Sequence, residues 1–399
     1  MTKTAIVAPK TEVEGARVIG KFIGDERGAT LIAIGSLHGN EPSGAIALKR
    51  VAQKLENLRA KLRGKVYLLA GNTRALERGV RFVDADLNRL WTYDNLFKTK
   101  SDFRLRKAED FEQRELLRIF DEVLKTAKDE VYALDLHSTS AKGLPFATVG
   151  DTVRNRRFAQ KFPVTILLGI EEQLDGTMLE YLNNEGAVTL GFEGGQHDSP
   201  EAIRNHEALL WLALVNSGIL AAEDAPDLEK YRETFAASSG SKLILEVRHR
   251  EAIKPEDDFE MNAGFENFDA IKHGQTLAKN KSGVVCARES GLILMPLYQK
   301  QGEDGFFIGR EVAPFWLWLS GILRKLKMGD LMHFLPGVRR YFNKETLIVN
   351  TSVARFFPLQ IFHLLGFRKL RWQDNKLIVS GRRHDTESPF KKEVINYGR

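Results

Sequence analysis

The chain has 399 residues, enough for two or three domains, and contains one cysteine, Cys286. Apolar residues make up 43% and charged residues 28%, which argues against collagen-like, disordered and membrane-embedded proteins. A single thiol excludes an internal disulfide and a cysteine-rich metal site. We expect this thiol to be buried and the protein to be cytoplasmic, because the N-terminus shows no secretory signal.

The net charge of +6 is distributed unevenly along the chain. Residues 311–399 hold 16 Lys and Arg against 7 Asp and Glu, a net charge of +9, so residues 1–310 carry a net −3. An electrostatic partner would therefore meet only the last quarter of the chain. We expect no nucleic-acid partner.

From Ala16 onward, short β-prone runs alternate with longer amphipathic segments. The pattern predicts strands at 30–34, 65–70, 131–136 and 187–192, and helices at 45–58, 111–127 and 201–220. This alternation predicts an α/β fold, with a mixed, mostly parallel twisted sheet covered by helices on both faces. We assign residues 1–235 to this α/β domain.

The second half of the chain differs from the first in its composition and in the pattern of its predicted elements. Residues 221–240 are polar and predict a linker. Residues 236–312 contain short β-prone runs punctuated by glycines and predict a smaller β-barrel or sandwich-like domain. Residues 313–399 form a basic, aromatic C-terminal extension.

Aromatic side chains in this extension alternate with Lys and Arg. They are Trp316, Trp318, Phe334, Phe356, Phe357 and Trp372. The favoured interpretation is that they pack a subdomain or an oligomer interface. Peripheral contact with an anionic membrane is the less favoured alternative. The apolar run is too short to span a bilayer.

A pair of metal-ligand types follows the first predicted strand. His38 and Glu41 lie three residues apart where a helix begins. Imidazole and carboxylate are zinc ligands, and a catalytic zinc usually takes three protein ligands. His137, at the end of strand 131–136, is the best third candidate, because such enzymes gather their sites beyond the carboxyl ends of strands. By spacing alone, a capping or surface role for the pair is more common.

Two further clusters carry chemistry. Residues 81–89 contain Arg81, Asn88 and Arg89, planar donors suited to a carboxylate and an oxyanion. The alternative is a solvated loop whose own aspartates neutralise both arginines. Glu193 ends a predicted strand before two glycines, where a carboxylate can act as a general base.

Four separated segments stand in a particular order within residues 16–220. They are Gly71-Asn72-Thr73-Arg74-Ala75, the nine residues Arg81 to Arg89, Asp135-Leu136-His137-Ser138-Thr139 and Phe192-Glu193-Gly194-Gly195. In this order they resemble the succinylglutamate desuccinylase/aspartoacylase family, a branch of the zinc carboxypeptidase-like hydrolases.

The resemblance implies a zinc-dependent amidohydrolase that deacylates an N-acyl amino acid or a similar small carboxylate-bearing amide. It implies one Zn²⁺ per chain, held by His38, Glu41 and His137. Glu193 would activate water and protonate the leaving amine, and Arg81 would stabilise the oxyanion. Asn88 and Arg89 would bind a substrate carboxylate, while Asp135 would help to orient the site.

Two other functions remain open at this point. One is a carboxypeptidase-like peptidase with the same metal site. The other is an inactive zinc-binding module with a tail that contacts a partner or a membrane, although the presence of all the expected site residues argues against it. Asn183 stands where aspartoacylases carry a substrate-binding arginine, and Arg154, Arg156 and Arg157 are candidate replacements. The acyl group, the leaving amine and the oligomeric state stay open.

Overall fold

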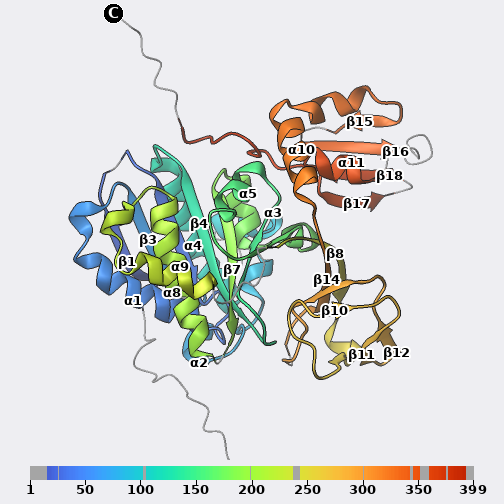
Figure 1. Cartoon of the computed structure of the whole chain (residues 1–399), viewed down its shortest axis with the longest axis horizontal. Helices are drawn as coiled ribbons and strands as arrows, with labels where there is room; N and C mark the ends of the chain where they lie inside the picture. Colours follow the sequence, from blue (N-terminus) through green and yellow to red (C-terminus); the bar gives the residue numbers. More distant parts are fainter. Residues whose placement is uncertain are drawn as a thin grey trace, which may run out of the picture.

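The structure is a computed structural model that describes residues 16–391, except 26, 102–104, 198, 237–242, 300, 342–344, 351–358 and 374–375. One large twisted sheet runs through the molecule (Figure 1). Its strands, in spatial order, are β1 (Val18–Ile23), β3 (Lys65–Ala70), β2 (Thr30–Gly35), β4 (Val131–Thr139), β7 (Val188–Gln196), β5 (Phe146–Val149), β6 (Thr165–Leu168), β8 (Ile244–Ala252), β14 (Asp304–Glu311), β13 (Gly291–Leu294) and β10 (Ala270–Ile271).

The middle of this sheet is parallel. Strand β2 pairs in parallel with β3 and β4, and β4 pairs in parallel with β7. Strand β5 is antiparallel to β7, and the outer strands β1, β14, β13 and β10 are also antiparallel to their neighbours. The predicted fold class, a mixed α/β sheet, is confirmed.

Helices cover both faces because the central strands are apolar on both sides. Leu31 and Ala33 pack into the core under α1 and α8, whereas Ile32 and Ile34 pack into the core under α4. The main helices are α1 (Ser43–Glu56), α4 (Ala108–Thr126), α5 (Val153–Ala159), α7 (Met178–Asn184), α8 (Pro200–Asn216) and α9 (Leu228–Ala236). The others before the C-terminal extension are η2 (Arg59–Lys61), α2 (Thr73–Arg78), η3 (Leu87–Arg89), α3 (Tyr93–Lys100), α6 (Ile170–Gln173), η4 (Ala222–Asp224) and η5 (Pro255–Asp257).

The prediction of a linker at residues 221–240 is wrong for most of the residues in this range that the structure describes. Helix α9 occupies much of it, and its Leu228, Tyr231 and Phe235 are buried in the core that α1 and α8 share. These three residues lie at helical spacing, so they form an apolar stripe. The polar composition of the segment hid that stripe, because the other residues of the helix face solvent.

The β-rich region does not close into a separate barrel. Strands β8, β14, β13 and β10 extend the large sheet, while β12 (Gly283–Cys286), β11 (Thr276–Asn280) and β9 (Glu260–Met261) form a small sheet beside it. The expectation that Cys286 is buried is wrong. It lies at the end of the edge strand β12 and is exposed.

The C-terminal extension has its own sheet and core (Figure 1). Its elements are α10 (Pro314–Lys325), η6 (Met328–Phe334), β15 (Val338–Arg340), β16 (Thr346–Asn350), α11 (Leu359–Leu364), β17 (Lys369–Gln373) and β18 (Lys376–Ser380). Met332, Leu347, Phe362 and Val379 are among the buried residues of its core. Within the described parts of the chain, no helix is long and apolar enough to cross a bilayer.

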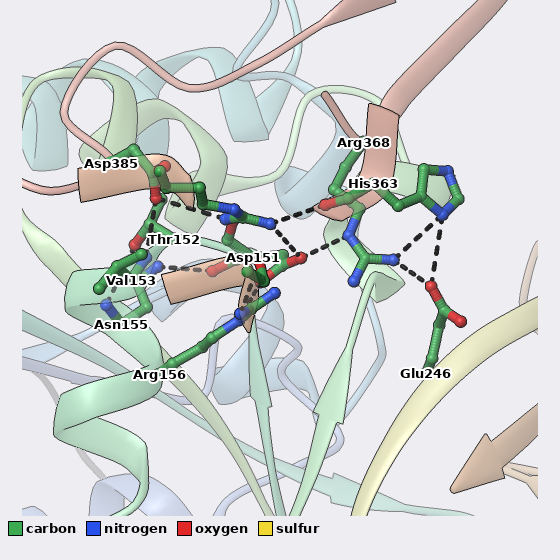
Figure 2. A network of polar contacts seen from close by, with 12 residues as sticks. Asp151, Thr152, Val153, Asn155, Arg156, Glu246, His363, Arg368 and Asp385 are labelled. Carbon is green, nitrogen blue, oxygen red and sulfur yellow. Dashed lines mark hydrogen bonds and ion pairs between the residues drawn. The ribbon is translucent and has the colours of Figure 1, made fainter. Parts of the chain in front are cut away.

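A buried ion cluster fixes this extension to the catalytic layer (Figure 2). Asp151 lies two residues after the end of β5, is buried, and contacts the guanidinium groups of Arg156, Arg324 and Arg368. Burial would raise the pKa of Asp151, but these three cations outweigh it and hold the pKa well below its usual range. Arg324 and Arg368 belong to the extension, so one carboxylate joins the two parts.

Asp151→Asn is expected to lower the free energy of unfolding by about 3–5 kcal/mol, because three largely buried arginines would lose their shared counter-charge. Arg232→Ala is a matched control at the exposed pair Arg232–Glu229, where a change within about 1 kcal/mol is expected. A urea titration followed by circular dichroism measures both. Equal, small effects of the two substitutions would show that the cluster does not hold the extension in place.

Candidate active site

The site lies where three parallel strands end side by side. In the β2–β4 pair, Gly35 lies opposite Leu136, and in the β4–β7 pair His137 lies opposite Glu193. Parallel strands bring their carboxyl ends to the same edge of the sheet. The register therefore places the predicted residues of β4 and β7 directly beside the loop that follows β2.

A tight turn between β2 and α1 presents His38 and Glu41. Ser36 adopts a left-handed backbone conformation with φ of 60°, and its hydroxyl donates a hydrogen bond to the backbone oxygen of Glu41 at 2.9 Å. Gly39 has no room for a side chain, since a Cβ there would lie 2.1 Å from the carbonyl carbon of Ala75. The turn thus packs against α2 and points both side chains toward the strand ends.

Three side chains converge here. The Nδ1 of His38 lies 2.9 Å from Oε1 of Glu41, and the Nδ1 of His137 lies 3.1 Å from the other carboxylate oxygen. One ligand atom from each residue lies within 4.8 Å of the other two. The geometry brings together the three residues predicted to bind metal.

Each histidine ring also contacts a second carboxylate through its Nε2, the nitrogen that does not face Glu41. The Nε2 of His38 lies 3.1 Å from Asp86, and the Nε2 of His137 lies 2.8 Å from Asp135. Such carboxylates fix the ring orientation and leave the other ring nitrogen as a metal ligand. In both rings, the nitrogen left for a metal is the one facing Glu41.

The electrostatics of the cluster favour a positive charge. Burial would raise the pKa of Glu41, but His38 and His137 outweigh it and hold the pKa well below its usual range. Burial would lower the pKa of His137, yet Asp135 and Glu41 raise it well above its usual value. The surrounding carboxylates therefore stabilise a cation at this point.

Glu193 completes the polar wall next to His137. Burial raises the pKa of Glu193 to about 7, and its Oε2 is covered but has no hydrogen-bond partner among the described residues. The two glycines after it have steric roles. A Cβ on Gly194 would lie 2.6 Å from the His206 ring, and Gly195 has a φ of 125°.

The segment containing Arg81 is organised by a carboxylate that sequence analysis missed. Glu109, buried at the start of α4, accepts hydrogen bonds from the backbone N–H groups of residues 83, 84 and 85 at 2.7, 3.0 and 3.1 Å. Arg81 then lies 3.5 Å from Glu41 and donates to Asp86 at 3.1 Å. Of the two aspartates in the solvated-loop alternative, only Asp86 pairs with Arg81, and Asp86 is buried.

Asn88 and Arg89 line the same cavity, each with a partner. Asn88 accepts a hydrogen bond from the backbone N–H of Met178 at 2.9 Å. Arg89 lies 3.2 Å from Glu303 and 3.2 Å from Asp304, which come from the β-rich region. The predicted carboxylate-binding arginine therefore already contacts two carboxylates of the protein.

These side chains surround a cavity of about 160 Å³. Its lining includes all seven predicted site residues: His38, Glu41, Arg81, Asn88, Arg89, His137 and Glu193. Asn183 does not line it and instead donates to the backbone oxygen of Ala187. Arg154 and Arg156 do not replace the missing arginine, because they pair with Glu130 and Asp151 outside the cavity.

Residues from the β-rich region also line the cavity. They include Met295, Leu297, Gln299, Glu303 and Asp304. Gln299 contacts Asn40 at 3.2 Å and His197 at 3.3 Å, so it joins this region to the rim of the site. No local pattern marks these residues, because their role depends on contacts between distant parts of the chain.

Residues 27–208 match the model of the succinylglutamate desuccinylase/aspartoacylase catalytic domain. This segment contains every residue predicted for the site. These residues therefore form a catalytic domain of the succinylglutamate desuccinylase/aspartoacylase family.

Two curated relatives illustrate the range of the family. A succinylglutamate desuccinylase of Pseudomonas putida is 25% identical over 317 residues, covering 75% of this chain and 88% of that protein. An N-acyl-aromatic-L-amino acid amidohydrolase of Xenopus laevis is 28% identical over 201 residues, covering 47% of this chain and 62% of that protein. Both names describe deacylating hydrolases.

Solved structures share the fold. A succinylglutamate desuccinylase/aspartoacylase from Rhodobacter sphaeroides aligns with a TM-score of 0.55 at 18% identity, covering 73% of this chain and 88% of that chain. The product-bound ectoine utilization protein EutE (DoeB) from Ruegeria pomeroyi aligns with a TM-score of 0.53 at 19% identity, covering 72% and 87%. At these identities, the likeness establishes the fold alone.

For a zinc ion held by His38, Glu41 and His137, Asp86→Asn and Asp135→Asn are each expected to weaken binding by roughly 10- to 100-fold, because His38 or His137 would lose the carboxylate that orients its ring. Competition with a chromophoric chelator measures the affinity. Asp84→Asn is a matched control in the same loop, because Asp84 accepts from the backbone N–H of Ala108 and not from the cluster. Unchanged affinity in both test variants would rule out the assigned ligand set.

Proposed function

We propose that this protein is a zinc-dependent amidohydrolase that removes the acyl group from an N-acyl amino acid. The observation that carries the proposal is the cluster of His38, Glu41 and His137 beside Glu193 in one small cavity. The named relatives add support, because they are deacylating hydrolases in the same family.

The residues present fit a zinc ion. Two imidazoles and one carboxylate form a donor set typical of catalytic zinc, and the carboxylates behind both rings match the usual outer partners. His38, Glu41 and His137 would hold the ion. When bound, zinc supplies Lewis acidity, which polarises a carbonyl oxygen and lowers the pKa of water.

Glu193 is suited to move the proton. A carboxylate with a pKa of about 7 can accept a proton from water at neutral pH and then donate it to the leaving amine. Its covered Oε2 has no other described partner, so it is available for this hydrogen bond. The same residue would thus serve first as base and then as acid.

Arg81 is placed to stabilise negative charge on the substrate. Its guanidinium lies 3.5 Å from Glu41 and is fixed by Asp86. A donor held in place before the reaction stabilises an oxyanion without further reorganisation. Arg81 would therefore bind the amide oxygen as negative charge develops on it.

The cavity favours a substrate with a single carboxylate. Arg81 and Arg89 are the arginines in its described lining, and both already contact carboxylates of the protein. Glu303 is the more exposed partner of Arg89, so a substrate carboxylate can compete with it. No further described arginine or lysine lines the cavity to receive a second carboxylate. We therefore expect amino acids with neutral side chains to be preferred over aspartate or glutamate.

The size of the cavity favours a small amide over a peptide. A volume of about 160 Å³, with Met295, Leu297, Gln299 and Glu303 along one side, suits a small amide better than an extended peptide. The deacylase proposal is therefore preferred to the carboxypeptidase-like alternative.

Glu193→Gln is expected to lower kcat by about 10²- to 10⁴-fold while zinc stays bound, because the amide cannot carry the proton. Amine release from a panel of N-acetyl and N-succinyl amino acids measures turnover, and elemental analysis measures zinc. Activity close to that of the unaltered protein would remove Glu193 from the mechanism.

Arg89→Ala is expected to raise KM about 10- to 100-fold with little change in kcat, because a charged hydrogen bond made in both ground and transition states is lost. Glu303→Gln is expected to lower KM, since it removes the competing carboxylate. Glu266→Gln is the matched control, an exposed carboxylate of the same region outside the cavity lining. A fall in kcat alone for Arg89→Ala would instead assign this residue to the oxyanion.

A further inference from the structure

Helix α10 in the C-terminal extension buries polar side chains and exposes apolar ones, the reverse of an ordinary surface helix. Its buried face carries Ser320 and Arg324, which bond to the backbone oxygen of Leu364 and to Asp151. Its outward face carries Phe315 and Trp318, which are 57% and 61% exposed. The polar side of the helix is therefore fixed to the protein. Part of its apolar surface, the side that carries Phe315 and Trp318, is presented to solvent, whereas Leu317 packs against the core.

More exposed apolar side chains follow in η6, the next element, which contacts α10. Met328, Leu331 and Phe334 of η6 are exposed, whereas Met332 is buried in the core of the extension. A 3₁₀ helix has three residues per turn, so side chains three apart lie in one line. Together with Phe315, Trp316, Trp318 and Leu326, these three residues form what we call the α10 face.

Exposed large hydrophobic side chains are concentrated in this segment of the chain. Of the sixteen exposed large hydrophobic side chains in the described parts of the chain, seven fall within the twenty residues 315–334. Scattered exposed hydrophobics need no explanation, but a concentration of this kind marks an interaction surface. Trp316, Trp318 and Phe334 are predicted from the sequence to pack a subdomain or an oligomer interface. All three are exposed, so the subdomain part is wrong for them, and the oligomer interface stays a prediction. Phe356 and Phe357 lie outside the described residues, as does the side chain of Trp372.

The charges around the α10 face indicate the kind of partner. Lys325, Lys327, Arg339 and Arg340 are exposed in the same part of the chain. Between residues 313 and 341 the sequence has one acidic residue, Asp330, which pairs with Arg340 at 3.5 Å. A second carboxylate, Glu387, comes from a later part of the chain and lies 3.3 Å from Lys327. Tryptophan and phenylalanine beside lysine and arginine are the side chains that suit the headgroup region of an anionic bilayer.

We propose that the α10 face binds the surface of an anionic membrane, with its aromatic side chains at the level of the lipid headgroups. The twelve residues of α10 span about 18 Å, too short to cross a hydrocarbon core of about 30 Å, so the helix lies in the plane of the interface. A symmetric pairing of two copies is disfavoured, because it would bring the same lysines of both chains together.

The test is sedimentation of the full chain with vesicles of phosphatidylcholine alone or mixed with phosphatidylglycerol. Binding to the mixed vesicles is expected, with weak binding to phosphatidylcholine and a decrease as salt is added. Phe315→Ser with Trp318→Ser should weaken binding more than about tenfold. Lys325→Gln and Lys327→Gln should each weaken it about fivefold.

Tyr93→Ser with Phe97→Ser is the matched control, because these aromatic residues of α3 are 82% and 65% exposed and lie outside the α10 face. This variant should bind like the unaltered protein, and circular dichroism should show that all variants are folded. Failure of the unaltered protein to bind either vesicle, or equal binding by the Phe315→Ser, Trp318→Ser variant, would overturn the proposal. So would a dimer in sedimentation velocity that this variant converts to monomer.

Discussion

The parallel register of β2, β4 and β7 is the constraint on which the site depends. It sets His137 opposite Glu193 and brings the turn after β2 to the same edge of the sheet. A shift of one residue in β4 would turn His137 to the opposite face, because side chains alternate along a strand. Leu134 and Leu136 pack into one core and Val131 and Ala133 into the other, and close packing of these unequal side chains opposes such a shift. The core that folds the protein therefore also positions its chemistry.

Buried carboxylates carry the next level of organisation. Asp86 and Asp135 hold the two histidines, Glu109 shapes the loop that contains Arg81, and Asp151 joins the C-terminal extension to the sheet. Each is desolvated, and each is compensated by charged partners or several hydrogen bonds, which is the condition for a carboxylate to be tolerated inside a protein. A buried carboxylate with compensating partners therefore organises each of three features: the cluster of His38, Glu41 and His137, the loop that contains Arg81, and the junction with the C-terminal extension.

The sequence predicts the α/β layers well, because strong periodicity in the strands and helices survives in the folded protein. It also picks out His38, Glu41 and His137, which the structure brings together. It does not reveal the contact between Arg89 and Glu303, which are 214 residues apart in the sequence. It also does not reveal that α10 buries its polar side chains. It mistakes α9 for a linker because three apolar residues are outnumbered by polar ones. Local patterns thus predict elements, whereas the cavity wall and the exposed face arise from tertiary packing.

Hydrolysis of an N-acyl amino acid is proposed to require zinc held by His38, Glu41 and His137. The test is amine release by the purified chain before zinc removal, after removal by a chelator, and after zinc is restored, with zinc content determined at each stage. We expect one zinc per chain, loss of amine release when the metal is removed and recovery when it returns. Amine release that persists in the zinc-free protein would contradict the proposed role of zinc.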